Sequence, residues 1–436
     1  MSEVNLFNYQ QNLFERICSI EELKLAFKAV KRNGGAPGVD GITLEEFEGR
    51  LPEELNRLKK EIESWIYEPS PGRRVEIPKP GGAGVRLLGI PTVRDRVVHA
   101  AIKAVLEPIF EPLFSEHSYG FRPGRNQRQA VEAAQRVVQS GKEWVVDLDL
   151  AQFFDRIHHD RLIYRLGLHI QDKRVLRLIG LTLRSGIMKD GVVSASTEGS
   201  VQGSPLSPLL SNVVLDELDK ELERRGLEFC RFADDSNIFV GSQAAAERIM
   251  KSVTRFIEKR LKLVVNREKS KVAKSKDVKF LGLTIVNGAI AISAKSMARA
   301  MDKVKELTLR GTSLNIEQAV EKINSWYVGW AGYYKMTQYP SQLAAIEAHL
   351  RRRLRARIVS QQKRKRHLFE KLLQLGVSRE LARIVYTNRN RWALSHSRAL
   401  HVAFPNSWFI EKLGQKIVSD QKHPHWFSLE NWIKLA

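Results

Sequence analysis

Apolar and polar positions along the chain predict short strands interleaved with helices. A buried strand is indicated in EWVVDLDLAQFF, where two aspartates are surrounded by the apolar residues Trp144, Val145, Val146, Leu148 and Leu150. Two further apolar runs of β type meet in CRFADDSNIFV (230–240). Helices are predicted over 206–225 and over 19–32, the latter with Ser19 and Glu22 at capping-box spacing. The mixture favours an α+β fold.

Three aspartates lie at the ends of these predicted strands. Asp234 and Asp235 stand where two apolar runs meet, a position that Asp also occupies merely because it tolerates turns. Asp149 ends the upstream strand, where a carboxylate is costly unless it is paired or bound to a metal; the alternative is that it caps a helix beginning near Gln152. Two metal ions about 4 Å apart need carboxylates that converge from separate strands, so the three aspartates predict a two-metal site.

Longer segments around these aspartates occur in one fixed order. They are SYGFRPGR (118–125), DLAQFFDRIHHD (149–160), EGSVQGSPLSPLLSNVVLDELD (198–219), RFADDSNIFV (231–240), LKLVVNREKSKV (261–272) and KFLGL (279–283). The pattern continues upstream in GGAPGVDGIT (34–43) and RRVEIPKPGGAGVRLLGIPTVRDRVV (73–98), and downstream in INSWYVGWAGYY (323–334). A single short motif is weak evidence, but the ordered set is specific. It resembles the group II intron-encoded reverse transcriptases/maturases.

The resemblance implies a role for each aspartate. Asp149, Asp234 and Asp235 are the catalytic residues of the implied site, which holds two Mg²⁺ ions, with Mn²⁺ as an alternative. Leu150 is implied as a further metal-binding residue. Asp147 is the weaker alternative to Asp149.

The resemblance also implies a nucleotide site, formed by Lys79, Arg86, Leu150, Phe154, Gln202 and Ala233. Phe154 falls under the incoming sugar, where its ring excludes a ribose 2′-hydroxyl. Gln202 begins a Gln-Gly-Ser-Pro segment that lines the pocket. The following Gly203-Ser204-Pro205 also has the composition of a turn before a helix, and the two interpretations are compatible.

Lys79 and Arg86 flank a glycine-rich stretch, as at the tip of a fingers hairpin that folds over a nucleoside triphosphate. A cation there neutralises charge on the departing pyrophosphate. The alternative is a solvated basic hairpin tip. The stretch is not a Walker loop, because the chain has no G-x-x-x-x-G-K-[ST] pattern.

One position departs from the family pattern. Most relatives carry Tyr-Ala-Asp-Asp, whereas this chain has Phe232-Ala233-Asp234-Asp235. The ring can still pack at the primer terminus, but any hydrogen bond through the phenol hydroxyl is lost. Because the metal ligands remain, we expect activity.

Charge indicates a nucleic-acid partner independently of the motifs. The chain has 71 Lys+Arg against 49 Asp+Glu, a net charge of +22 and a pI near 10.0, enough to attract a polyanion by counterion release. The densest run is RRRLRARIVSQQKRKRH (351–367), in which Leu354, Ile358 and Val359 fit one apolar helical stripe. Nucleic-acid contacts are therefore expected at Arg351, Arg352 and Arg355, and on a second helix at Lys24, Lys28 and Lys31. A solvated charged face is the alternative for both sets.

The 436 residues allow more than one domain. The expected architecture is a right-hand polymerase with an antiparallel palm sheet, a helical thumb and a basic C-terminal module. Its predicted parts are an N-terminal helical extension (1–72), fingers and palm (73–285), a helical thumb (286–366) and a basic nucleic-acid-binding module (367–436). The aromatic cluster at Trp326, Tyr327, Trp330, Tyr333 and Tyr334 is expected mainly in the thumb core.

Two cysteines, Cys18 and Cys230, are too few for a disulfide framework or a cysteine-based zinc site. Many group II intron proteins end in an H-N-H endonuclease with cysteine pairs. No segment of this sequence matches that pattern. No run approaches 18 apolar residues and no signal peptide is recognisable, so we expect a soluble protein without a membrane partner in a bacterial-type cytoplasm.

The resemblance implies an RNA-directed DNA polymerase that is also a maturase, assisting intron splicing and retrotransposition. Its expected partners are the RNA template, intron RNA, the DNA primer or target, the RNA–DNA duplex and deoxynucleotides. A monomer and a homodimer are both compatible with the sequence. Two alternatives stay open: a domesticated reverse transcriptase in DNA repair or phage defence, and a splicing-only RNA-binding protein. Intact Asp149, Asp234 and Asp235 argue against the second.

Overall fold

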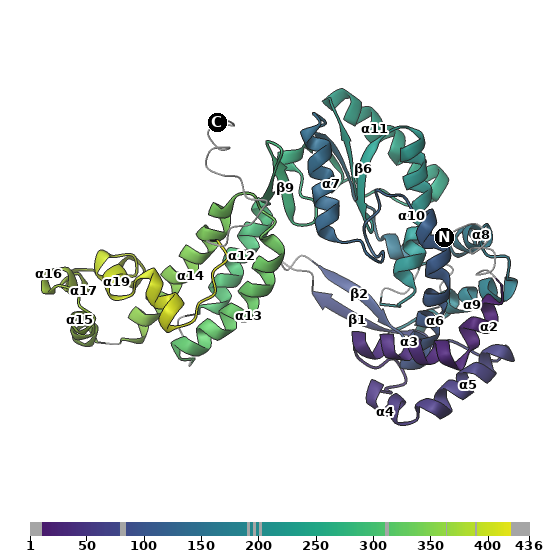
Figure 1. The fold of residues 1–436 in the computed structure, drawn as a ribbon, viewed down its shortest axis with the longest axis horizontal. Helices are drawn as coiled ribbons and strands as arrows, with labels where there is room; N and C mark the ends of the chain where they lie inside the picture. Colours follow the sequence, from purple (N-terminus) through teal and green to yellow (C-terminus); the bar gives the residue numbers. More distant parts are fainter. Residues whose placement is uncertain are drawn as a thin grey trace. The chain divides into compact units, whose positions relative to one another are not determined.

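The chain folds as two units in the computed structural model, Met1–Lys274 and Ser275–Ala436 (Figure 1). The structure describes residues 11–78, 84–189, 192–194, 198–199, 203–309, 314–362, 364–388 and 390–419. The boundary between the units falls inside the part 73–285 that the sequence assigns to fingers and palm. The four-part division stays a prediction.

The first unit begins with helices that share one core. They are α2 (Leu13–Cys18), α3 (Ile20–Asn33), α4 (Leu44–Gly49), α5 (Leu51–Glu63) and α6 (Val93–Phe110). The Ser19 hydroxyl accepts a hydrogen bond from the Glu22 amide at 3.1 Å, as the capping spacing predicts. Helix α3 buries Leu23, Phe27 and Val30 and packs against α6, so its Lys24, Lys28 and Lys31 side face is exposed.

A four-stranded sheet follows in the order β2-β1-β4-β5. Its strands are β1 (Gly72–Pro78), β2 (Val85–Ile90), β4 (Ile187–Lys189) and β5 (Val192–Ser194). Strand β1 pairs antiparallel with β2 and parallel with β4. This sheet brings the 73–90 hairpin beside the segment that precedes residue 198.

A second four-stranded sheet has the order β6-β7-β3-β8, and its neighbours are all antiparallel. The strands are β3 (Trp144–Leu148), β6 (Glu228–Phe232), β7 (Asp235–Val240) and β8 (Lys271–Lys274). Strand β3 confirms the predicted buried strand, because Val145, Val146 and Leu148 are at most 1% exposed. Helix α7 (Gln127–Gln139) packs against β6, and α11 (Gln243–Phe256) packs against β3 (Figure 1).

Helix α10 confirms the helix predicted over 206–225, and it runs over Ser207–Arg224. The other elements of this unit are η1 (Glu111–Leu113), η2 (Phe153–Arg156), α8 (His159–Gly167), α9 (Lys173–Arg184) and the π-helix η3 (Ile257–Leu261). One hydrophobic core extends from Leu13 to Val265 and joins the N-terminal helices to the second sheet.

The second unit is mainly helical. It starts with η4 (Ser275–Asp277) and the hairpin of β9 (Leu283–Val286) and β10 (Ala289–Ile292). Its helices are α12 (Ala294–Leu307), α13 (Ile316–Tyr334), α14 (Pro340–Gln361), α15 (Lys365–Gln374), α16 (Arg379–Ala382), α17 (Ile384–Thr387), α18 (Arg391–Leu394), α19 (Arg398–Ala403) and the π-helix η5 (Trp408–Lys412). A separate core runs from Ala300 to Phe409. Tyr327 is fully buried in it, with Trp326 and Trp330 packed alongside.

Helix α14 carries the basic run that the sequence singles out. Leu354, Ile358 and Val359 are buried, as the apolar stripe predicts. Arg355 and Arg357 are buried as well, at 2% and 1% exposure. The arginines of this run are therefore not all on the surface of the helix. Across the described residues, no helix is long and apolar enough to cross a membrane.

Candidate active site

The aspartate pair lies in a tight hairpin turn between β6 and β7. Phe232 pairs with Asp235, so the turn consists of Ala233 and Asp234. Ala233 has a φ of 58°, a left-handed conformation that a non-glycine residue adopts at a cost and that tight hairpin turns use. The turn holds the two carboxylates at adjacent positions, Asp234 in the turn itself and Asp235 at the start of β7.

Asp149 lies beside this turn because of the strand register. Leu148 of β3 pairs with Ser236 of β7. One step further along this antiparallel ladder, Asp149 comes next to Asp235. Its carboxylate is 42% exposed and lies 3.7 Å from the Lys269 ammonium. The site therefore combines carboxylates from two neighbouring strands with one cation.

The main chain of Asp149 is fixed by residues more than a hundred positions later. Its amide donates to the Ser270 hydroxyl at 3.0 Å, and its carbonyl accepts from the Asn266 amide at 2.8 Å. Leu150 is 7% exposed and forms an isolated bridge with Val265. The helix that follows, η2, has Gln152 as its N-cap and no side-chain cap bond, so Asp149 does not cap it.

A buried ion pair supports the aspartate turn from behind. The Arg231 guanidinium binds the Asp219 carboxylate of α10, and both side chains are fully buried. The same guanidinium donates to the Ala233 carbonyl at 2.9 Å and to the Asn212 side-chain oxygen at 3.0 Å. Arg231 thus ties the turn to helix α10.

Gly120 packs against the main chain of the aspartate turn. The Asn212 amide donates to its carbonyl at 2.9 Å. A Cβ added at Gly120 would lie 2.1 Å from the Ala233 nitrogen, a distance that no side chain could occupy. The SYGF segment therefore touches the aspartate turn directly, and only glycine fits there.

Phe154 lies in η2, five residues beyond Asp149. Its ring is half-buried and meets the Phe153 ring edge-on, with centroids 5.2 Å apart. Phe153 is 3% exposed. Packing against a buried ring limits the rotamers of Phe154.

The segment after residue 202 packs against α6 and β2. Gly203 has a φ of 126°, and a Cβ there would lie 2.6 Å from the Gly89 carbonyl oxygen. The Ser204 hydroxyl lies 2.9 Å from Nδ1 of the buried His99. Burial lowers the pKa of His99 to about 4, so the imidazole is neutral at pH 7 and can share one hydrogen bond with Ser204.

The side chains of three predicted nucleotide residues, Lys79, Arg86 and Gln202, lie outside the described part of the chain. Lys79 and Gln202 lie outside the described residues. Arg86 lies in β2, where its main chain pairs with Ile77; its side chain is not among those described. The predicted roles of all three stay predictions.

The described donors suit a divalent metal ion in chemistry. Carboxylate oxygens are the ligands that Mg²⁺ and Mn²⁺ prefer, and Asp149, Asp234 and Asp235 supply them from adjoining main-chain positions. In the part of the chain that the structure describes, no three His, Cys, Asp or Glu side chains converge closely enough to enclose an ion. The Lys269 ammonium is the charge that balances Asp149 in this arrangement.

The two predicted nucleic-acid surfaces differ in exposure. Lys24, Lys28 and Lys31 are exposed on α3, and Lys31 forms an ion pair with Glu48 at 2.6 Å. On α14, Arg351 and Arg352 are half-buried, and the Arg352 guanidinium stacks on Trp392 at 4.2 Å.

Arg355 corrects the sequence interpretation. Its guanidinium is buried and donates to the Phe404 carbonyl at 2.9 Å and to the Asn406 side chain at 3.1 Å. It is not available for a phosphate contact. An arginine in a helix between buried leucines can hold neighbouring loops through its several donors, a role that the charge run alone does not reveal.

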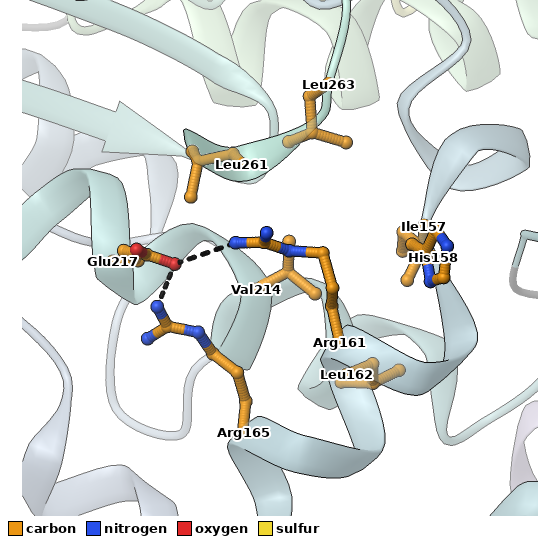
Figure 2. A pocket seen from close by; sticks show the side chains of 9 residues that line it. All are labelled: Ile157, His158, Arg161, Leu162, Arg165, Val214, Glu217, Leu261 and Leu263. Atoms are coloured by element: carbon orange, nitrogen blue, oxygen red, sulfur yellow. Dashed lines mark ion pairs between the residues drawn. The ribbon is translucent and has the colours of Figure 1, made fainter. Parts of the chain in front are cut away.

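A small hollow lies between α8 and α10 (Figure 2). Arg161 and Arg165 converge there on Glu217, the former at 3.7 Å. The hollow has a volume of about 20 Å³, which admits one water molecule and no nucleotide. It is a packing defect beside an ion-pair cluster.

Sequence reasoning missed the residues that support the site. Arg231, Asp219 and His99 are buried, yet none was singled out. One signal was present: an arginine within the apolar strand EFCRF must have a buried partner. Nothing in the sequence identifies which acid provides it, because Asp219 is one of several acids in its helix.

Comparison with known proteins identifies two domains in this chain. Residues 77–285 match the family model described as reverse transcriptase (RNA-dependent DNA polymerase), and residues 297–376 match the group II intron, maturase-specific domain. Protein YkfC of Escherichia coli (strain K12) is 34% identical over 302 residues, which cover 60% of this chain and 79% of YkfC. The group II intron-encoded protein LtrA of Lactococcus lactis is 32% identical over 230 residues, which cover 53% of this chain and 38% of LtrA.

These matches confirm the predicted α+β polymerase fold and the predicted pair of activities, reverse transcriptase and maturase. Reverse transcriptase domains depend on divalent metal ions and act on nucleic acids. The family match therefore implies a divalent metal ion and a nucleic acid for this chain. The chain spans well under half the length of LtrA. With a reverse transcriptase domain followed by a maturase-specific domain, the chain belongs to the group II intron-encoded reverse transcriptase/maturase family.

Proposed function

We propose that this chain extends a primer 3′-hydroxyl along an RNA template with deoxynucleotides, using Asp149, Asp234 and Asp235 as its catalytic carboxylates. The observation that carries the proposal is the register between β3 and β7, which puts the end of one strand next to the aspartate turn. A polymerase centre needs carboxylates from separate strands at one point.

The three carboxylates, with Leu150 beside them, would hold two Mg²⁺ or Mn²⁺ ions, which supply a stronger nucleophile and neutralise the leaving pyrophosphate. The chain's own residues select and orient the substrate. Phe154 lies in the segment directly after Asp149 and would exclude a ribose 2′-hydroxyl. Ala233, with its small side chain, leaves room beside the nucleotide. Gln202, Lys79 and Arg86 complete the proposed nucleotide site.

The direct test is primer extension on an RNA template with Mg²⁺ and deoxynucleotides. We predict that Asp149→Asn and Asp234→Asn each lower the extension rate by at least about 100-fold, because an amide cannot replace a metal-binding carboxylate. Binding of the primed RNA should stay within a few-fold of wild type. Asp160→Asn, an exposed aspartate on α8, is the matched control. Extension by either active-site variant at more than a few per cent of the wild-type rate would refute the assignment.

The chain is further proposed to bind the RNA of its own intron as a maturase. Its match to a maturase-specific domain supports this function, as does the net charge of +22. The proposed contacts are the exposed lysines Lys24, Lys28 and Lys31, and on α14 the residues Arg351 and Arg352. If the reading frame lies outside any ribozyme-like intron, the alternative of a domesticated reverse transcriptase is favoured instead.

A further inference from the structure

A basic groove lies on the first unit and is not lined by the three aspartates. It is formed by α11, η3 and the segment from Val265 to Val272, and its volume is about 600 Å³. The charged residues that line it are Lys251, Arg255, Glu258, Lys259, Arg267 and Lys271. None of the three aspartates lines this groove.

The groove is strongly positive. Five of its six charged residues are cations, and all five are exposed. Its one acid, Glu258, already accepts hydrogen bonds from Arg267 at 3.1 and 3.2 Å. Like charges gathered around one hollow repel one another, and a bound polyanion relieves that repulsion.

The groove and the candidate active site share the segment that contains Lys269 and Ser270. Ser270 lines the groove, and its hydroxyl bonds the main chain of Asp149 at 3.0 Å to the amide and 3.3 Å to the carbonyl. The preceding residue, Lys269, instead approaches the Asp149 carboxylate. Because none of the three aspartates lines the groove, a ligand there would contact Asp149 only through Ser270.

The dimensions fit a single nucleic-acid strand. Lys251 and Arg255 of α11 and Lys259 of the π-helix η3 follow at intervals of four residues, which span at most about 12 Å at the α-helical rise of 1.5 Å per residue. A stacked strand carries one phosphate per about 3.4 Å, so about three or four phosphates face this row. A hollow of this volume accommodates nucleotide-sized groups, whereas a duplex could only rest across its rim.

We propose that this groove binds an unpaired strand of the intron RNA through its phosphates, independently of the template–primer. The inference deepens the proposed maturase function and rests on it. Arg267 and Lys271 contact the strand from the wall opposite the helical row. Binding is electrostatic and independent of base sequence.

The test compares two triple variants of the full-length protein. One is Lys251→Ala/Arg255→Ala/Lys259→Ala in the groove, and the other is Arg128→Ala/Arg136→Ala/Lys220→Ala at exposed positions of α7 and α10. Both remove three positive charges. The probes are an unstructured 20-nucleotide RNA and an RNA duplex of 20 base pairs, titrated at several salt concentrations. Denaturant midpoints confirm that each variant is folded, and Lys→Gln and Arg→Gln changes replace Ala if the groove variant is not.

We expect the groove variant to bind the single-stranded RNA about 10- to 100-fold more weakly, with the slope of log affinity against log salt shallower by about two. Duplex binding should change by less than about threefold, and the control triple should match wild type. Primer extension on a short primed RNA should stay within about twofold of wild type.

Three results would overturn the inference: equal single-strand affinity in the groove and control variants, equal loss on duplex and single strand, or a loss of primer extension parallel to the loss of RNA binding. Absence of extension by the wild-type protein would instead count against the proposed polymerase function. The binding comparison would still decide the groove.

Discussion

Arg231 is the residue on which the aspartate turn depends most directly. Its guanidinium reaches the Asp219 carboxylate, the Asn212 side chain and the Ala233 carbonyl, all in the interior. Removing one partner of a buried ion pair leaves the other charge unpaired, which costs about 3–5 kcal/mol, whereas replacing both with apolar residues is often nearly neutral. Comparing the single and the double replacement therefore distinguishes a role of Arg231 in stability from a role in positioning the aspartate turn.

We predict that Arg231→Met alone lowers the free energy of unfolding by about 3–5 kcal/mol. The double variant Arg231→Met/Asp219→Leu should recover most of this stability. It should still extend primers at least about tenfold more slowly at saturating nucleotide, because methionine cannot bond the Ala233 carbonyl and the turn loosens. Urea unfolding and single-turnover kinetics give the two readouts, with the KM for nucleotide expected to change less than kcat. A double variant with wild-type kcat would show that the ion pair is needed only for folding.

Phe154 gives the second prediction for a single residue. Replacing it with valine removes most of the ring that the Phe153 contact orients, so a ribose 2′-hydroxyl gains room. We expect the ratio of ribonucleotide to deoxynucleotide incorporation to rise by at least about tenfold, or 1.4 kcal/mol in relative transition-state free energy. Competition between the two nucleotide types in primer extension measures the ratio, with Phe153→Leu as a control for loss of packing. An unchanged ratio would place the sugar gate at another residue.

The residues with a proposed chemical task were recognisable in the sequence, whereas the residues that support them were not. Asp149, Asp234 and Asp235 stood out because carboxylates at the ends of apolar strands are costly without a ligand. His99, in contrast, is one of several polar residues in α6, and its contact with Ser204 depends on tertiary packing between residues more than a hundred positions apart. Arg355 shows the opposite error, since a charge count cannot distinguish an exposed guanidinium from a buried one.

At the scale of elements, α6 packs against the segment that begins at Gly203, the residue that follows the proposed nucleotide residue Gln202 in the chain. The one polar contact described between them joins His99 to Ser204, and Nε2 of the ring is buried with no partner among the described residues. Protonation would place a charge in this interior position. Burial therefore favours the neutral ring at this position.

Acidification should lower the free energy of unfolding through His99. Burial lowers the pKa of His99 to about 4 in the folded chain, whereas the unfolded chain takes up the proton near pH 6.5. Between these values the unfolded state binds more protons, so the histidine's contribution is fully present above pH 6.5 and is lost as the pH falls toward 4. At pH 5 the loss is about 2 kcal/mol relative to pH 7.

The comparison variant is His99→Gln, which keeps hydrogen-bonding atoms and cannot titrate in this range. The difference in free energy of unfolding between pH 7 and pH 5 should be about 2 kcal/mol smaller in the variant than in wild type. Urea titrations at the two pH values measure it. Identical pH dependence in both proteins would mean that the pKa of His99 is the same in the folded and the unfolded chain, which would refute the prediction.

Secondary structure followed the sequence where burial is simple. Strand β3 and helices α3 and α10 agree with their predicted ranges because each buries one regular apolar pattern. The neighbours in the sheet were not predictable in the same way. The order β6-β7-β3-β8 is set by pairings between distant strands, which local periodicity does not encode.

At the scale of the whole molecule, the two units have separate hydrophobic cores. In the second unit, the buried Glu347 of α14 accepts hydrogen bonds from the Tyr327 hydroxyl at 2.6 Å and from the Val418 and Ser419 amides at 2.7 and 3.1 Å. Burial raises the pKa of Tyr327 well above its ordinary value, so the phenol remains a donor. One carboxylate thus joins two helices to the segment at 418–419.

We predict that the two units unfold in separate transitions, because chains with independent cores deviate from two-state behaviour. Glu347→Leu should lower only the transition of the second unit, by about 2–4 kcal/mol, since buried donors lose their acceptor. Hydrogen exchange with peptide resolution assigns each transition to its unit, and Glu380→Leu on the exposed face of α16 is the control. A single transition that includes both units would refute the prediction.

The position of β3 between β7 and β8 has a consequence for synthesis on the ribosome. Both partners of this strand come later in the chain, and the hydroxyl that fixes the Asp149 amide belongs to a residue 121 positions downstream. At about 5–20 residues per second, a nascent chain waits roughly 6–24 seconds between these two residues. Until β7 has been synthesised both edges of this apolar strand are unpaired, and until β8 has been synthesised one edge still is, a state prone to aggregation. Chains that terminate before Ser270 cannot fix the Asp149 amide, so the proposed site is completed only late in translation.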